Sequence, residues 1–76
     1  MSDIASHVRK RSVRIAGHRT SVSMEDAFWD ELASIAKTRG LSINALIANI
    51  DESRGGNLSS AVRVFILDDV RKRQAP

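Results

Sequence analysis

The sequence is 76 residues long and contains 12 Lys and Arg, 9 Asp and Glu and no cysteine. A chain of this length forms one domain and buries only about 60% of its unfolded surface, so its stability is marginal without further support. The lack of cysteine excludes disulfides and thiolate metal sites as that support. Oligomerisation is the remaining common solution, and we expect more than one copy to act together.

The net charge of +3 is unevenly distributed along the chain. Residues 1–19 carry five Lys and Arg against one acid, residues 20–70 four against eight, and residues 71–76 three against none. Basic ends around an acidic middle are typical of a protein that binds a polyanion, and equally of basic termini that only aid solubility. No apolar run approaches a membrane span and the start does not resemble a signal peptide, so we expect a soluble cytoplasmic protein.

The first part of the chain is predicted to be a flexible arm. Residues 1–11 show no sustained periodicity and end in a basic run, which is typical of a mobile basic segment. We expect the folded domain to span residues 12–73 and a short tail to cover residues 74–76.

Two short segments with strand periodicity flank Ala16-Gly17. A two-residue turn there would pair Ile15 with His18 and Val13 with Thr20, and would separate the side chains by polarity. The expected inward residues are Val13, Ile15, His18, Thr20, Val22 and Met24, and the expected outward residues are Arg14, Arg19, Ser21 and Ser23. A straight strand through Gly17 is the alternative, because Ala-Gly is a weak signal for this turn.

The strand from Arg19 to Met24 leads directly into a helix, and a chain this small cannot bury such a strand alone. A second copy of the chain offers an identical strand, so two copies could form an antiparallel ribbon. This ribbon would present Arg19, Ser21 and Ser23 in duplicate on its open face. We therefore expect an intersubunit ribbon whose exposed face fits a DNA groove.

The first helix is predicted over residues 25–39. Its apolar residues recur with helical spacing, Ser23 and Asp26 have the spacing of a capping box, and Gly40 follows its end. A Ser23 that caps the helix is less free to contact another molecule, so two roles compete for this side chain.

Two further helices are predicted. The second runs from about Ile43 to Arg54 with Ser42 as its N-cap, and the third begins after the double glycine that follows. Val64 and Leu67 widen the apolar stripe of the third helix beyond that of a surface helix. This width favours burial from two sides, one of them against a partner subunit.

The order of strand, helix, short connection and helix resembles the ribbon-helix-helix family of DNA-binding proteins. The resemblance depends on Met24 at the end of the strand, Leu32 and Ala36 in the first helix, and the connection at residues 40–47, Gly-Leu-Ser-Ile-Asn-Ala-Leu-Ile. Glu25 stands where many members have proline, and the third helix lies outside the minimal fold. The resemblance implies an α+β fold in which two chains intertwine through an intersubunit antiparallel β-ribbon, with an additional C-terminal helix.

In that family the paired strands enter the major groove, and the first turn of the second helix lies against a DNA phosphate. The resemblance implies base contacts from Arg19, Ser21 and Ser23. We expect Arg19 to carry most of the specificity, because a guanidinium can bind guanine O6 and N7 together whereas a serine hydroxyl discriminates weakly. The residues expected to contact phosphates are Arg9, Lys10, Arg11, Arg14, Ser42 and Asn44.

The resulting hypothesis is a bacterial homodimeric regulator that binds double-stranded DNA and represses transcription, with assembly beyond the dimer left open. The alternative is a dimeric adaptor or antitoxin-like module that docks on another protein through the third helix. We expect no enzyme, because no nucleophile, base and orienting group occur at a recognisable spacing. Two histidines without cysteine are too few for a metal site, and no cofactor is expected.

Overall fold

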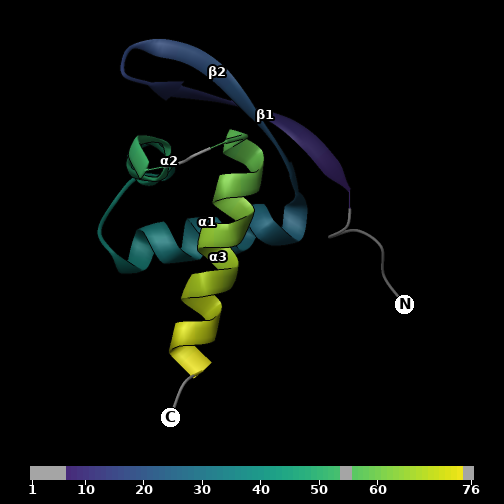
Figure 1. Cartoon of the computed structure of the whole chain (residues 1–76), viewed down its shortest axis with the longest axis vertical. Coiled ribbons are helices and arrows are strands. Elements are labelled where there is room, and N and C mark those ends of the chain that lie inside the picture. The colour runs from purple at the N-terminus through teal and green to yellow at the C-terminus, as the bar shows by residue number, and fades with distance from the viewer. Residues whose placement is uncertain (1–6, 54–55, 75–76) are drawn as a thin grey trace.

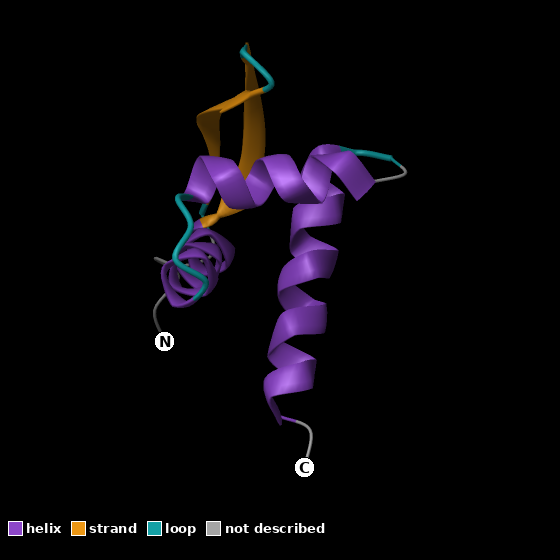
Figure 2. Cartoon of the chain, turned by 90° about the vertical axis from the view of Figure 1, so that its left-hand side faces the viewer, coloured by secondary structure: helices purple, strands orange, loops and turns teal. Residues whose placement is uncertain are grey.

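The computed structural model describes residues 7–53 and 56–74. The elements in chain order are β1 (Val8–Ile15), β2 (His18–Glu25), α1 (Asp26–Thr38), α2 (Ile43–Ser53) and α3 (Leu58–Gln74). The two strands form a hairpin on one side of the molecule, and the three helices run in different directions beneath it (Figures 1 and 2). The fold is therefore α+β, as predicted.

The hairpin has the predicted two-residue turn. Its register pairs Ile15 with His18 and Val13 with Thr20, as the turn at Ala16-Gly17 requires. Ala16 and Gly17 have φ angles of 52° and 82°, and two successive positive φ angles define a type I′ turn. Glycine adopts this conformation without a steric penalty, whereas alanine does not, which is why the sequence signal is weak.

The strand β2 finds its partner in the same chain. The hairpin expected from the sequence paired it only through Val13 and Ile15, but β1 pairs with it along its full length. The tight turn makes this pairing local, so it requires little loop-closure entropy. β1 begins at Val8, so residues 8–11 lie in a strand and not in the expected arm, whose residues 1–6 are outside the described part of the chain. The intersubunit ribbon stays a prediction.

The inner face of the hairpin is apolar only near the helices. Its buried residues are Val13, Val22 and Met24, as predicted. The register places His18 and Thr20 on the predicted inward face, but both residues are exposed and take no part in the core. His18 directly follows the turn, and Figure 2 shows that the turn end of the hairpin extends beyond the helices.

Every element contributes to one apolar core. The buried residues are Val13, Val22, Met24, Leu32, Ile35, Ala36, Leu46, Ile47, Ile50, Val62 and Ile66. No polar or charged side chain of the described residues is buried with them. α3 leaves Val64 and Leu67 outside this core, so the chain alone does not cover the wide apolar stripe predicted for that helix.

The start of α1 differs from the predicted capping box. Glu25 is the N-cap residue and makes no side-chain capping bond. Ser23 lies within β2, which continues to Glu25, so it is not the N-cap residue of α1. Its backbone N–H donates to Ser59 Oγ of α3 at 3.1 Å. The N–H of Asp26 donates to the carbonyl of His7 at 3.1 Å, which ties the start of the helix to the start of the hairpin.

The starts of α2 and α3 are capped by side chains. Ser42 Oγ accepts the N–H of Ala45 at 3.0 Å, which confirms the predicted N-cap of α2. Asn57 Oδ1 accepts the N–H of Ser60 at 3.0 Å and performs the same function for α3.

Candidate nucleic-acid interface

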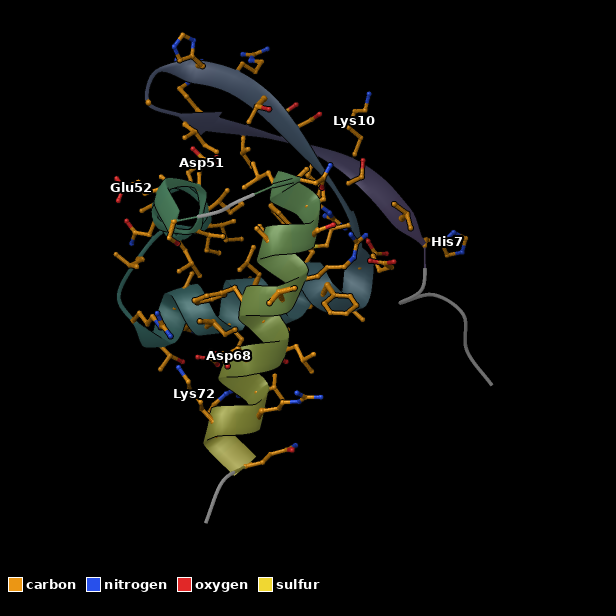
Figure 3. The ribbon with its side chains drawn as sticks, viewed as in Figure 1. His7, Lys10, Asp51, Glu52, Asp68 and Lys72 are labelled. Atoms are coloured by element: carbon orange, nitrogen blue, oxygen red, sulfur yellow. The ribbon has the colours of Figure 1, made fainter. Side chains whose placement is uncertain are left out.

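The outer face of the hairpin is polar and is turned away from the helices. Side chains alternate between the faces of a strand, so the residues between the buried positions share this face. The cross-strand pairs of the outer face are Lys10 with Ser23, Ser12 with Ser21, Arg14 with Arg19 and, at the end next to α1, Val8 with Glu25. Figure 3 shows Lys10 pointing away from the helices. The three residues expected to contact bases therefore lie on one surface, opposite polar and basic residues of β1.

Two of the five basic residues of the hairpin are on its inner face and bind the first helix. Arg9 Nε lies 3.3 Å from Asp26 Oδ1, and Arg11 Nη2 donates a hydrogen bond to the same oxygen. The Arg11 guanidinium also lies over the Trp29 ring, 4.7 Å from its centroid, and its side chain is only 20% exposed. These contacts join the hairpin to the start of α1 and occupy the Arg11 guanidinium within the protein.

The other three basic residues of the hairpin, Lys10, Arg14 and Arg19, lie on the outer face and are exposed. None of them makes an ion pair or a side-chain hydrogen bond within residues 7–53 and 56–74. Arg14 and Arg19 are directly opposite each other, and like charges in that position destabilise a strand pair. An anion bound at this face would relieve the repulsion.

The start of α2 lies beside this face. A hollow of about 300 Å³ is lined by Ser12, Val13, Arg14, Arg19 and Asn44. The structure thus brings together Arg19, which is expected to contact a base, with Arg14 and Asn44, which are expected to contact phosphates. Ser42 precedes α2 and is exposed, but its hydroxyl accepts the amide of Ala45.

The α3 helix contacts β2 at its C-terminal end, far from the turn of the hairpin. Arg63 Nη2 donates to the carbonyl of Ser23 at 3.2 Å, and Arg63 Nε donates to Glu25 Oε1 at 3.0 Å. Backbone hydrogen bonding at Glu25 and the bond from Arg63 lower the pKa of the Glu25 carboxyl below 4.5. Ser23 is consequently half-buried beside α3. No sequence pattern indicated this contact, because Arg63 is 40 residues from Ser23.

Two features are absent from the described residues 7–53 and 56–74. No group of three His, Asp or Glu residues lies close enough to hold a metal ion. No helix is both long and apolar enough to cross a membrane.

The fold agrees with comparisons to known proteins. The family described as ribbon-helix-helix domain matches residues 8–70. The chain therefore belongs to the ribbon-helix-helix family, a family of DNA-binding proteins that are typically not enzymes. This confirms the resemblance seen in the sequence, and the matched region includes β1 and most of α3.

One solved structure is similar over most of the chain. It is that of an uncharacterized protein from Bordetella pertussis Tohama I, with 32% sequence identity and a TM-score of 0.75. The match covers 88% of this chain and 58% of that protein, so this chain spans little more than half the length of its bacterial relative. The comparison with curated proteins gave no match.

Proposed function

We propose that this protein is a double-stranded DNA-binding regulator that represses transcription and places the outer face of its hairpin in the major groove. The observation that carries the proposal is the division of the hairpin cations, because the three on the outer face have no ion pair with a described residue, while Arg9 and Arg11 bind Asp26. The major groove is about 12 Å wide and admits a two-stranded ribbon. Membership of a DNA-binding family supports the same function.

The positions of the outer-face residues suggest their roles. Ser21 and Ser12 form the middle pair of the face, where side chains would reach base edges. Ser23 would contribute less, because it is half-buried beside α3. Lys10 would follow a neighbouring phosphate, since a flexible ammonium binds phosphates without base specificity.

The protein would act as a homodimer. Two copies related by a twofold axis would present two hairpins and read the two halves of a symmetric site. A 76-residue chain gains stability from such an assembly, and Val64 and Leu67 remain exposed in the single chain.

A salt series of binding to duplex genomic fragments tests the proposal. We expect the logarithm of the binding constant to fall linearly with the logarithm of salt concentration, because phosphate contacts release counterions. Lys10→Gln should weaken binding to all sequences and reduce the salt slope by about 1. Lys37→Gln, which removes an exposed cation from α1, is the matched control and should change neither quantity. Undetectable or salt-independent binding would contradict the function.

A second candidate is a protein-binding module that docks through α3. Val64 is 65% exposed and lines an open hollow of about 680 Å³ between α2 and α3, and Leu67 is 47% exposed elsewhere on α3. Apolar side chains in such a position are typical of protein contacts. A stoichiometric protein partner that co-purifies with a chain lacking DNA affinity would favour this candidate over the first.

A further inference from the structure

We propose that Arg14 and Arg19 grip one and the same DNA phosphate, with the Asn44 side chain as a third contact. The proposal rests on the DNA-binding function proposed above. It gives Arg19 a different role from the base contact that the family resemblance implies.

The register places the two guanidinium groups next to each other. The N–H of Asp26 donates to the carbonyl of His7, so these two residues form a hydrogen-bonded pair of the ladder. Hydrogen-bonded and non-hydrogen-bonded pairs alternate along an antiparallel hairpin, which makes Arg14 and Arg19 a non-hydrogen-bonded pair. The Cα atoms of such pairs are about 4.5 Å apart, the closer of the two kinds, and both side chains leave the same face.

The described surroundings of the pair provide room for an anion. Neither Arg14 nor Arg19 has an ion-pair partner in the described part of the chain. Both line the hollow of about 300 Å³, and Asn44 approaches it from the first turn of α2. Each guanidinium has five N–H donors and the Asn44 amide has two, so the residues that line this hollow can supply donors to an anion.

A phosphate suits this arrangement better than a base edge. Guanine offers O6 and N7 to one guanidinium, which would leave the second arginine unpaired and repelled beside it. A phosphodiester carries a negative charge, and its oxygens accept from several directions, so it can satisfy two guanidinium groups together. Base discrimination then depends on Ser12 and Ser21, whose hydroxyls discriminate weakly, and we expect modest sequence specificity.

A double-mutant cycle on duplex DNA tests the shared contact. We compare Arg14→Gln, Arg19→Gln and the double variant, all at exposed positions where the fold should persist. Each single change should weaken binding roughly tenfold, and the double change should weaken it by much less than the product of the two. Lys10→Gln, on the same face but outside the hollow, should combine with Arg19→Gln multiplicatively. Multiplicative losses from Arg14→Gln and Arg19→Gln would overturn the shared contact.

Base preference separates the phosphate role from the base role. Selection of binding sites from randomised duplexes should return the same sequence for the native protein and for Arg19→Gln. A neutral methylphosphonate at one DNA position should abolish the effect of both arginine substitutions. A changed preference at one base pair in the Arg19→Gln variant would show that Arg19 reads a base, and would overturn the proposal.

Titration of the free protein with inorganic phosphate distinguishes failure of the phosphate contact from failure of the DNA function. In nitrogen-15 NMR spectra, the Nε–H signals of Arg14 and Arg19 and the side-chain amide of Asn44 should shift together with one dissociation constant. Shared shifts without DNA binding would leave an anion site and contradict the DNA function. DNA binding with unrelated or absent shifts would overturn the shared contact and leave the DNA function standing.

Discussion

At the scale of single residues, the face of the hairpin decides what a basic side chain binds. Lys10 and Arg11 are neighbours in sequence, yet one is exposed on the outer face and the other lies between Asp26 and the Trp29 ring. The net charge of a sequence segment counts Lys10 and Arg11 alike, although only Lys10 is exposed. The alternation of side chains in a strand separates a residue that can contact DNA from one that stabilises the fold.

Arg11→Met tests this division because it keeps the apolar stem of the side chain and removes the charge. We expect the free energy of unfolding to fall by about 1–2 kcal/mol, since a hydrogen bond between charged groups and a cation–π contact are lost. Urea denaturation measures the change. The control Lys10→Met, on the outer face, should stay within about 0.5 kcal/mol of the native protein. Equal losses in the two variants would show that the face does not matter.

At the scale of elements, α3 holds the C-terminal end of β2 in place. The Ser59 hydroxyl and the Arg63 guanidinium occupy the backbone groups of Ser23, and Arg63 also binds Glu25. These contacts replace the capping box expected at the start of α1. The third helix therefore supports the hairpin and belongs to the folded domain.

The Glu25 contact predicts a dependence of stability on pH. The pKa of Glu25 is lower in the folded chain than its ordinary value of 4.5, through backbone hydrogen bonding and the bond from Arg63. The stabilisation is therefore fully present above the unfolded pKa and is lost as the pH falls through the folded pKa. We expect the native protein to melt at a higher temperature than Glu25→Gln at about pH 6, and the difference to shrink as the pH falls below 4.5. Melting curves across this range measure it, and a difference that stays constant would exclude this origin.

At the scale of the whole molecule, the hairpin leaves unpaired backbone groups along both of its edges. Because the hydrogen-bonded pairs alternate, the N–H and C=O groups of Arg19 and Ser21 point out from β2, and those of Lys10 and Ser12 point out from β1. An intersubunit ribbon of the kind expected for the family would pair through the backbone groups at the β2 edge. The N–H and C=O of Ser23 already bind Ser59 and Arg63 of α3, so fewer groups of this edge can pair with a second copy.

Proline substitutions distinguish the two edges, because proline removes one backbone donor. We expect the native protein to have twice the mass of one chain at micromolar concentration in sedimentation equilibrium. Ser21→Pro should raise the dimer dissociation constant at least about tenfold, whereas Ser12→Pro, the matched change on β1, should leave it near the native value. A monomeric native protein would contradict the dimer, and a loss confined to Ser12→Pro would move the contact to the β1 edge.

The local patterns of the sequence determined the elements of this protein. The period of the apolar residues gave three helices, Ser42 marked the start of α2, and the polarity on either side of Gly17 gave the hairpin register. The connection at residues 40–47 and the residues around it gave the family. These features depend on interactions within a few residues, which is why the sequence alone carries them.

Tertiary structure decided which of the candidate residues are available to DNA. It placed Arg11 on Asp26, Ser23 beside α3, and Arg14 and Arg19 with Asn44 around one hollow. The contact with Asp26 spans 15 residues, and the contact between α3 and β2 spans about 40. Contacts between elements depend on how the core packs them together, and no periodicity within one element encodes that packing.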